Sequence, residues 1–146
     1  IAVDTSKKWI NEVRSKFNKK TLTRANIHHV DLGDVGSWGR PKSYDKQSSF
    51  SIYTDWIWLQ GNKPDTVLID GRFRVCSFLT CLKYADQGTK VIFDDYTDRA
   101  HYHVVEKFLA REAVCGRQCL FSIPHKSLIN YEELDNEINK FRNVMD

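Results

Sequence analysis

Short apolar runs that end in aspartate constrain the fold of this chain more than any other feature. Four such runs occur, and they end at Asp4, Asp31, Asp70 and the pair Asp94-Asp95. The runs before Asp70 and Asp94 are continuously apolar, as in strands buried on both faces of a parallel sheet. Segments with helical periodicity separate most of the runs. This alternation predicts an α/β fold, Rossmann-like, with a mostly parallel sheet and helices on both faces.

The last third of the chain follows a different pattern. Residues 113–115 and 120–123 are two short strand-like runs on either side of Gly116-Arg117, which predicts a C-terminal β-hairpin. Asn130 and Glu133 have the spacing of a helix capping box, so a final helix is expected to begin there. Earlier helices are expected at residues 53–59, 73–84 and 102–110, from the spacing of their apolar residues.

One long irregular stretch interrupts the alternation. Residues 33–59 are predicted as a long loop inserted within a single domain, 1–146, and the segment Gly33 to Trp58 is rich in aromatic residues. Long connections in small domains are often functional, so this region is a candidate substrate wall or protein-partner surface. A small satellite core under the loop is the alternative, and we favour it for Trp56 and Trp58.

Size, charge and cysteine content exclude several classes of protein. The chain has 146 residues and a net charge of +3, from 22 Lys and Arg against 19 Asp and Glu. This scattered excess does not indicate a nucleic-acid binder, and no apolar run is long enough to span a membrane. The four cysteines lack zinc-knuckle spacing. They are interpreted as buried free thiols in a reducing, intracellular compartment, with a four-thiol zinc site as the alternative.

The aspartates are candidate functional residues because of their position. Right-handed crossovers place the carboxyl ends of parallel strands along one edge, where α/β proteins bind ligands. A carboxylate there can accept hydrogen bonds from hydroxyl or amine groups, or bind a hard cation. The alternative is a local role, with Asp4 capping one helix and Asp95 or Asp98 another.

The same runs resemble the strands of class I S-adenosylmethionine-dependent methyltransferases. Ile-Ala-Val-Asp4 and His-Val-Asp31-Leu32 resemble the second and third strands of that family. Val-Leu-Ile-Asp70-Gly71 and Val-Ile-Phe-Asp94-Asp95-Tyr96 resemble the fourth and fifth. Three longer motifs look like a poorly characterised methyltransferase-like group; they begin at Asp31, Ile69 and Phe93. The resemblance extends from about Ile1 to Pro124.

The resemblance implies roles for the residues at these strand ends. Asp4, with Thr5 beside it, would hold the ribose of S-adenosylmethionine. Asp31 would contact the adenine amine, Leu32 would pack on the ring, and Asp70 would lie near the methyl group. The family's first strand and glycine-rich loop would precede residue 1, so the domain is expected to be incomplete at its N-terminus.

The candidate residues for proton transfer and for metal binding lie at or just after the same strand ends. The candidate catalytic residues are Asp70, Asp95 and His101, because methyl transfer needs a base for the acceptor's proton. An acidic pocket lining without metal is the favoured interpretation of Asp70, Asp94 and Asp95; a likeness to metal-dependent catechol-type methyltransferases implies the same three residues as a divalent-metal set, which is the alternative. Arg72 and Arg74 could clamp an anionic substrate or pair with Asp94 or Asp95.

These features together favour a methyltransferase-like protein that transfers a methyl group from S-adenosylmethionine to an oxygen or nitrogen acceptor. The alternative is a catalytically silent methyltransferase-like subunit with a structural or interaction role in a larger assembly. A nucleotide or sugar-nucleotide enzyme that uses the same acidic edge is a third interpretation.

Overall fold

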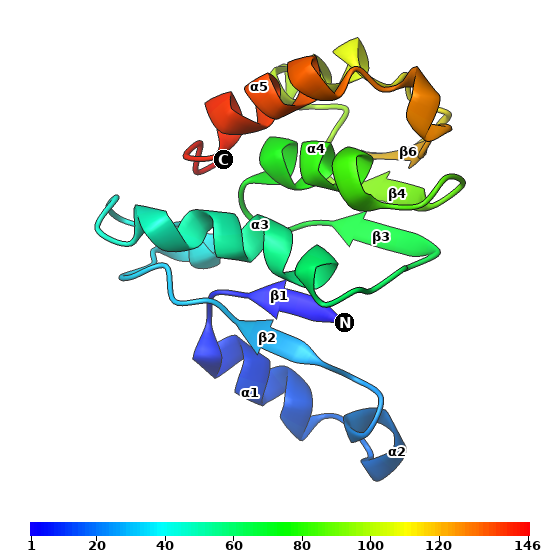
Figure 1. Cartoon of the computed structure of the whole chain (residues 1–146). Helices are drawn as coiled ribbons and strands as arrows, with labels where there is room; N and C mark the ends of the chain where they lie inside the picture. Colours follow the sequence, from blue (N-terminus) through cyan, green and yellow to red (C-terminus); the bar gives the residue numbers. More distant parts are fainter.

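The computed structural model describes all 146 residues and contains two sets of strands. In the first, β1 (Ala2–Asp4) pairs in parallel with β2 (Ile27–His29). The second is a four-stranded sheet in the order β3-β4-β6-β5 (Figure 1). Its strands are β3 (Thr66–Ile69), β4 (Lys90–Phe93), β5 (Ala113–Cys115) and β6 (Gln118–Ser122). β3 and β4 are parallel, whereas β6 is antiparallel to both β4 and β5.

The sheet is interrupted between β1 and β3. Alternate residues of a strand direct their main-chain groups to opposite sides. The carbonyls of Asp65 and Ile69 accept hydrogen bonds from the amides of Lys90 and Asp94, so every second residue of β3, counted from Asp65, faces β4 with its main-chain groups. Leu68 therefore directs its N–H and C=O away from β4, and its side chain is 59% exposed. On β1, Ala2 and Asp4 bond toward β2, so Val3 directs its main-chain groups to the open side. One further strand would make the sheet continuous.

Five α-helices connect and cover the strands: α1 (Lys7–Ser15), α2 (Lys19–Leu22), α3 (Phe50–Leu59), α4 (Arg74–Tyr84) and α5 (Tyr131–Phe141). Four 3-10 segments accompany them: η1 (Ser37–Gly39), η2 (Gln47–Ser49), η3 (Ala100–Lys107) and η4 (Lys126–Leu128). α1 packs on β2, and α3 contacts both β1 and α4. α3 thus joins the two sets of strands (Figure 1).

Helix α4 lies at the centre of the core. Eight of its eleven residues are buried, and it contacts β3, β4, α3 and α5. Phe78 packs its ring against Phe93 of β4 and Phe121 of β6, with centroid distances of 5.9 and 4.7 Å. A helix buried on nearly all sides fixes the turn before it, and that turn carries the candidate site.

The predicted fold class is confirmed, with several corrections. The hairpin forms across Gly116-Arg117, and α5 begins after Asn130, whose side chain accepts from the Glu133 amide. The predicted loop at residues 33–59 extends only to about residue 49, because α3 begins at Phe50 and contains the helix expected at residues 53–59. Residues 100–107 form 3-10 rather than α-helical turns. β4 is antiparallel to β6, so two of the four strand pairs are parallel.

The cysteines and helix lengths bear on two other predictions. All four cysteines are free thiols, but Cys115 is exposed, so the expectation of buried thiols was wrong for that residue. None of the helices combines the length and the apolar character needed to cross a membrane.

Candidate functional site

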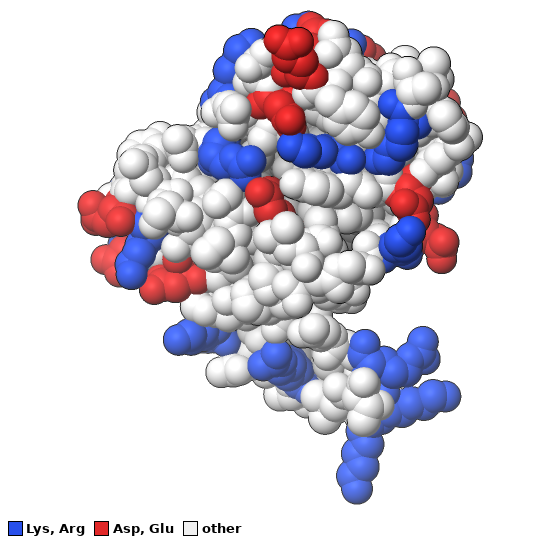
Figure 2. Space-filling model, in the orientation of Figure 1, with Lys and Arg blue, Asp and Glu red and all other residues white.

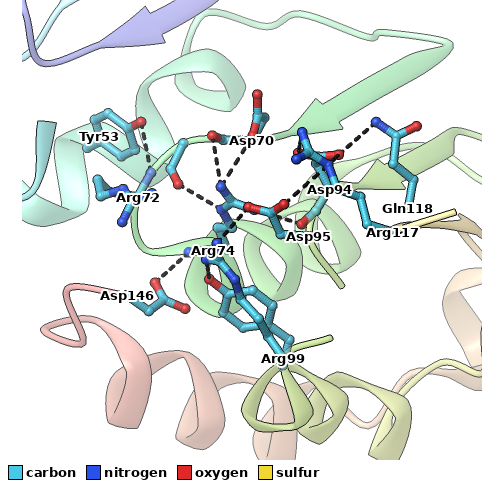
Figure 3. Close-up of polar contacts among 12 residues, drawn as sticks. Tyr53, Asp70, Arg72, Arg74, Asp94, Asp95, Arg99, Arg117, Gln118 and Asp146 are labelled. Atoms are coloured by element: carbon cyan, nitrogen blue, oxygen red, sulfur yellow. Dashed lines mark hydrogen bonds and ion pairs between the residues drawn. The ribbon is translucent and has the colours of Figure 1, made fainter. Parts of the chain in front are cut away.

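The structure brings Asp70, Asp94 and Asp95 together at the carboxyl ends of β3 and β4. Each can place one carboxylate oxygen within 4.8 Å of the others. Adjacent parallel strands end side by side, because Ile69 of β3 is in register with Phe93 of β4. The sequence-based expectation that these three acids converge is therefore confirmed (Figure 3).

The side chain of Arg74 lies at the centre of this cluster and is only 3% exposed. Its Nη1 donates to the Asp94 main-chain oxygen at 2.7 Å and to the Asp95 carboxylate at 3.1 Å. Its Nη2 lies 3.2 Å from the Asp70 carboxylate, and Nε donates to the Gly71 carbonyl at 2.9 Å (Figure 3). Arg74 thus clamps the two strand ends together, which is the structural role considered for it from the sequence.

Two more arginines and a glutamine complete the cluster. Arg117 Nη2 lies 2.9 Å from Asp94 Oδ2, and Gln118 donates to Asp94 Oδ1 at 2.8 Å. Arg99 Nη2 donates to Asp95 Oδ2 at 2.8 Å. Sequence reasoning did not find Arg117 or Gln118, because the pairing of β6 with β4 brings them to this edge.

The charges of the cluster are matched within the chain. Three carboxylates, those of Asp70, Asp94 and Asp95, contact three guanidinium groups, those of Arg74, Arg99 and Arg117. A divalent ion prefers several free, converging oxygen ligands, and Arg74 already bridges two of the three acids. The residues as arranged do not fit a divalent metal, so the metal set stays a prediction of the sequence alone.

The pKa of Asp70 is raised and that of Asp94 is lowered. Partial burial raises the pKa of Asp70 above its ordinary value; the Arg74 charge offsets this in part, while Asp94 adds to it. Burial also opposes ionisation of Asp94, but hydrogen bonds from Gln118 and Arg117 with the Arg117 charge outweigh it and lower that pKa. Asp70, whose side chain is 56% exposed, is therefore the member of the cluster better suited to accept a proton.

Backbone strain marks the same place. Asp95 and Phe73, the residues that follow β4 and precede α4, have φ angles of 56° and 54°. The left-handed region is uncommon for residues other than glycine, and residues held there concentrate at functional sites. The strained turns direct Asp95 and Arg74 toward each other across the ends of the two strands.

The acids at the ends of β1 and β2 lie in a second group. Asp4 accepts a hydrogen bond from the Ser6 amide at 2.7 Å, and Ser6 caps α1. Asp31 is exposed and accepts from the Gly33 amide at 2.9 Å; this hydrogen bond and the Lys46 charge lower its pKa. The caps are Ser6 for α1 and Arg99 for η3, so the alternative that Asp4 and Asp95 or Asp98 cap these helices was wrong. Asp4 keeps a second oxygen for other donors, whereas Oδ2 of Asp31 lies 3.6 Å from Lys46 Nζ.

Thr5 and Leu32, which follow the acids at the ends of β1 and β2, differ in what their side chains contact. The Thr5 hydroxyl donates to the Gly39 carbonyl at 3.4 Å, so the loop after β2 lies against the end of β1. Leu32 is 2% exposed and packs in the main core. The role of packing on the adenine ring, which the resemblance implies for Leu32, stays a prediction.

Tyr53 of α3 links the two groups of acids. Its hydroxyl accepts from the Arg72 amide at 3.3 Å (Figure 3). Burial raises the pKa of Tyr53, and the nearby charge of Asp4 adds to the rise. A Cβ atom at Gly71 would collide with this hydroxyl, so glycine is required for the close approach between α3 and the β3 turn.

The two histidines after β4 take different positions. His103 bonds through Nε2 to the Tyr96 carbonyl at 3.1 Å and stacks on the Tyr96 ring, so it has a packing role. His101 is exposed and lies against the Tyr102 ring, with a centroid distance of 4.3 Å. Of the two, His101 has the imidazole that is open to a ligand.

The loop after β2 and the C-terminal residues border a shallow hollow of about 470 Å³. It is lined by Gly36, Ser37, Arg40, Pro41, Lys42, Tyr44 and Met145. Trp38, at the tip of this loop, is 90% exposed and has a φ angle of 59°. Trp56 and Trp58 instead pack inward, Trp56 on His28 and Trp58 on the core, as the satellite-core interpretation predicted.

The comparisons with known proteins agree with this geometry. No protein-family model and no curated protein sequence matches the chain. The crystal structure of a methyltransferase-like protein from Silicibacter pomeroyi superposes with a TM-score of 0.79 at 27% sequence identity. The match covers 96% of this chain and 74% of that one. The chain has a methyltransferase-like, Rossmann-like α/β fold.

Proposed function

We propose that this chain forms most of the catalytic domain of an S-adenosylmethionine-dependent methyltransferase that acts on an oxygen or nitrogen acceptor. The observation that carries the proposal is the gathering of strand-end acids on a methyltransferase-like fold. Asp70, Asp94 and Asp95 lie together at the edge where open α/β sheets bind ligands. Asp4 and Asp31 end the neighbouring pair of strands.

The residues at β1 and β2 fit the nucleoside part of the cofactor. A ribose diol and an adenine amine are hydrogen-bond donors, and Asp4 offers a carboxylate oxygen beyond the one that accepts from the main chain. The second oxygen of Asp31 lies 3.6 Å from the exposed Lys46 side chain and would have to be shared with it. Thr5 lies next to Asp4, where its hydroxyl bonds to the loop. No G-x-G turn occurs among these residues. The interrupted sheet between Val3 and Leu68 supports a further strand and its loop as the remaining part of the site.

The cofactor supplies an electrophilic methyl group, and the protein must hold the acceptor in line with it and remove a proton. Both carboxylate oxygens of Asp95 contact arginine side chains, so Asp95 is a positioning residue in this proposal. Asp70 is more exposed and has a raised pKa, and we assign it the role of base. His101, on the same edge, is the second candidate for that role.

Calorimetric titration of S-adenosylhomocysteine into the full natural protein tests the proposal. The intact mass is measured first, to compare with 17.1 kDa. Asp4→Ala is expected to weaken binding about 10-fold or more, the effect of losing a hydrogen bond to a charged group. Asp34→Ala, in an exposed loop position without an ion pair, is the matched control. Saturable binding that Asp4→Ala leaves unchanged would contradict the assignment of Asp4.

A catalytically silent structural or interaction subunit is the second candidate function, and the matched charges of the acidic cluster favour it. An Asp95 held by three arginines joins strand ends without requiring any substrate. Absence of binding in the same titration, with an intact mass of 17.1 kDa, would support this alternative over the enzyme.

A further inference from the structure

The positive charge of the chain is concentrated in one part of the structure. Residues 7–24 contain seven lysine and arginine residues and one acid, Glu12, so they carry a net charge of +6. The rest of the chain carries −3, since the whole chain carries +3. No acid occurs between residues 13 and 30. The modest overall charge therefore conceals a strongly basic segment.

The fold presents this segment as a single basic surface, defined as the exposed lysine and arginine side chains of residues 7–24. They come from α1, α2 and the turns that follow each helix, and all of them are exposed. Figure 2 shows Lys and Arg side chains projecting from the α1–α2 end of the molecule, and no acid is visible beside them on this face. The one acid of the segment, Glu12, pairs with Lys16. Five of the lysines and arginines make no hydrogen bond or ion pair through their side chains: Lys7, Lys8, Lys19, Lys20 and Arg24.

We propose that this basic surface binds single-stranded nucleic acid. The proposal goes beyond methyl transfer and does not depend on it. Unpaired cations gain most from phosphate contacts because they release condensed counterions and give up no existing partner. The side chains of Lys20 and Arg24 also line a hollow of about 460 Å³ with Asn18, Thr21 and Ala25. This hollow offers the phosphate backbone several donors in one place.

Trp9 supplies the second element of such a surface. Its side chain is 52% exposed on α1, directly after Lys7 and Lys8 in the sequence. Exposed aromatic rings among basic residues stack on unpaired bases, which are accessible in single strands and not in a duplex. The combination of unpaired cations and an exposed indole favours a single-stranded partner.

The packing of α1 argues against a membrane surface as the partner. A helix that lies on a bilayer inserts its apolar face into the lipid. On α1 and the turn after it, Ile10 is buried and Val13 and Phe17 are half-buried, so the apolar side faces the protein. Half of the exposed residues of α1 and this turn are lysines or arginines, and Trp9 is the one large apolar side chain directed outward from them.

Fluorescence anisotropy with a labelled oligothymidylate of about 20 nucleotides tests the proposal, at several salt concentrations. One variant replaces four unpaired lysines of the basic surface with glutamine: Lys7, Lys8, Lys19 and Lys20. The control variant replaces four exposed lysines elsewhere, which gives the same net charge: Lys42, Lys63, Lys107 and Lys140.

The surface variant is expected to weaken binding at least about 10-fold and to reduce the slope of log affinity against log salt by up to about 3. The control variant should bind within about threefold of the original chain at the same salt. Trp9→Ala should weaken binding about fivefold while the salt slope stays the same. Urea unfolding of each variant checks that the fold is retained.

Three outcomes would overturn the proposal. An equal loss in the control variant would assign binding to overall charge. Absence of oligonucleotide binding at low salt would exclude the surface as a nucleic-acid site. Binding to phosphatidylserine vesicles without binding to the oligonucleotide would assign it to membranes. None of these outcomes depends on S-adenosylhomocysteine binding, so the two proposals succeed or fail separately.

Discussion

The buried guanidinium of Arg74 donates to the main-chain oxygen of Asp94 at 2.7 Å, and this contact joins the start of α4 to the end of β4. Arg74 also contacts the carboxylates of Asp70 and Asp95. A single buried cation therefore fixes the positions of three acids from two strand ends. The geometry of the candidate site depends on this one side chain.

Replacing Arg74 with methionine is expected to destabilise the protein by about 3–5 kcal/mol, because it leaves buried acceptors and acids without their cation. Urea unfolding followed by circular dichroism measures the loss. Arg99→Met is the matched comparison, since Arg99 is 39% exposed and contacts the same Asp95. Its cost should be below about 1 kcal/mol. Equal losses for the two variants would show that Arg74 is not the organising cation.

Asp70 and Asp94 should give opposite pH dependences of stability. The folded-state pKa of Asp94 is lowered from 3.8, so its contribution is present above that value and is lost as pH falls through the folded pKa. The pKa of Asp70 is raised from 3.8, so its contribution is present below that value and is lost as pH rises through the folded pKa.

Asp70→Asn should therefore gain stability relative to the original chain as pH rises from about 3.8, because Asn carries no proton to lose. Asp94→Asn should be less stable than the original chain at neutral pH, and this difference should shrink only as pH falls below about 3.8. Urea midpoints between pH 3 and 8 measure both differences. Parallel curves for the two variants would contradict the opposite shifts.

The sequence predicted the elements that local pattern determines. The apolar runs at residues 66–69 and 90–93 are β3 and β4, and the Asn130 cap begins α5. The convergence of Asp70 with Asp94 and Asp95 also followed from parallel pairing. Arg117, however, reaches Asp94 only through the antiparallel pairing of β6 with β4. No local pattern encodes that non-local pairing.

Other features depended on burial and packing that the sequence does not specify. The core position of Leu32, directly after Asp31, depends on non-local packing. The 3-10 geometry of η3 arises in a segment with ordinary helical spacing. Overall charge also hid the basic surface, since acids elsewhere offset it in the sum.

The close approach of Gly71 to Tyr53 gives a test of the link between the two groups of acids. Gly71→Ala should destabilise the fold by about 1–3 kcal/mol, because the added methyl group collides with the Tyr53 hydroxyl. Adding Tyr53→Phe removes that hydroxyl, so the cost of Gly71→Ala should fall by at least about 0.5 kcal/mol in the double variant. Urea unfolding of the four proteins completes the cycle. Additive losses would indicate that the two residues do not meet.

The interruption between β1 and β3 predicts a specific pattern of hydrogen exchange. Val67 and Ile69 direct their main-chain groups toward β4. Leu68 directs its amide to the opposite side of β3, toward β1, and has no main-chain acceptor there. The Leu68 amide should exchange at least about 100-fold faster than that of Ile69, because exchange from an unpaired edge needs no unfolding. Nuclear magnetic resonance on these 146 residues measures both rates. A protected Leu68 amide would mean that another strand covers this edge, and concentration-dependent protection would identify a second copy as its source.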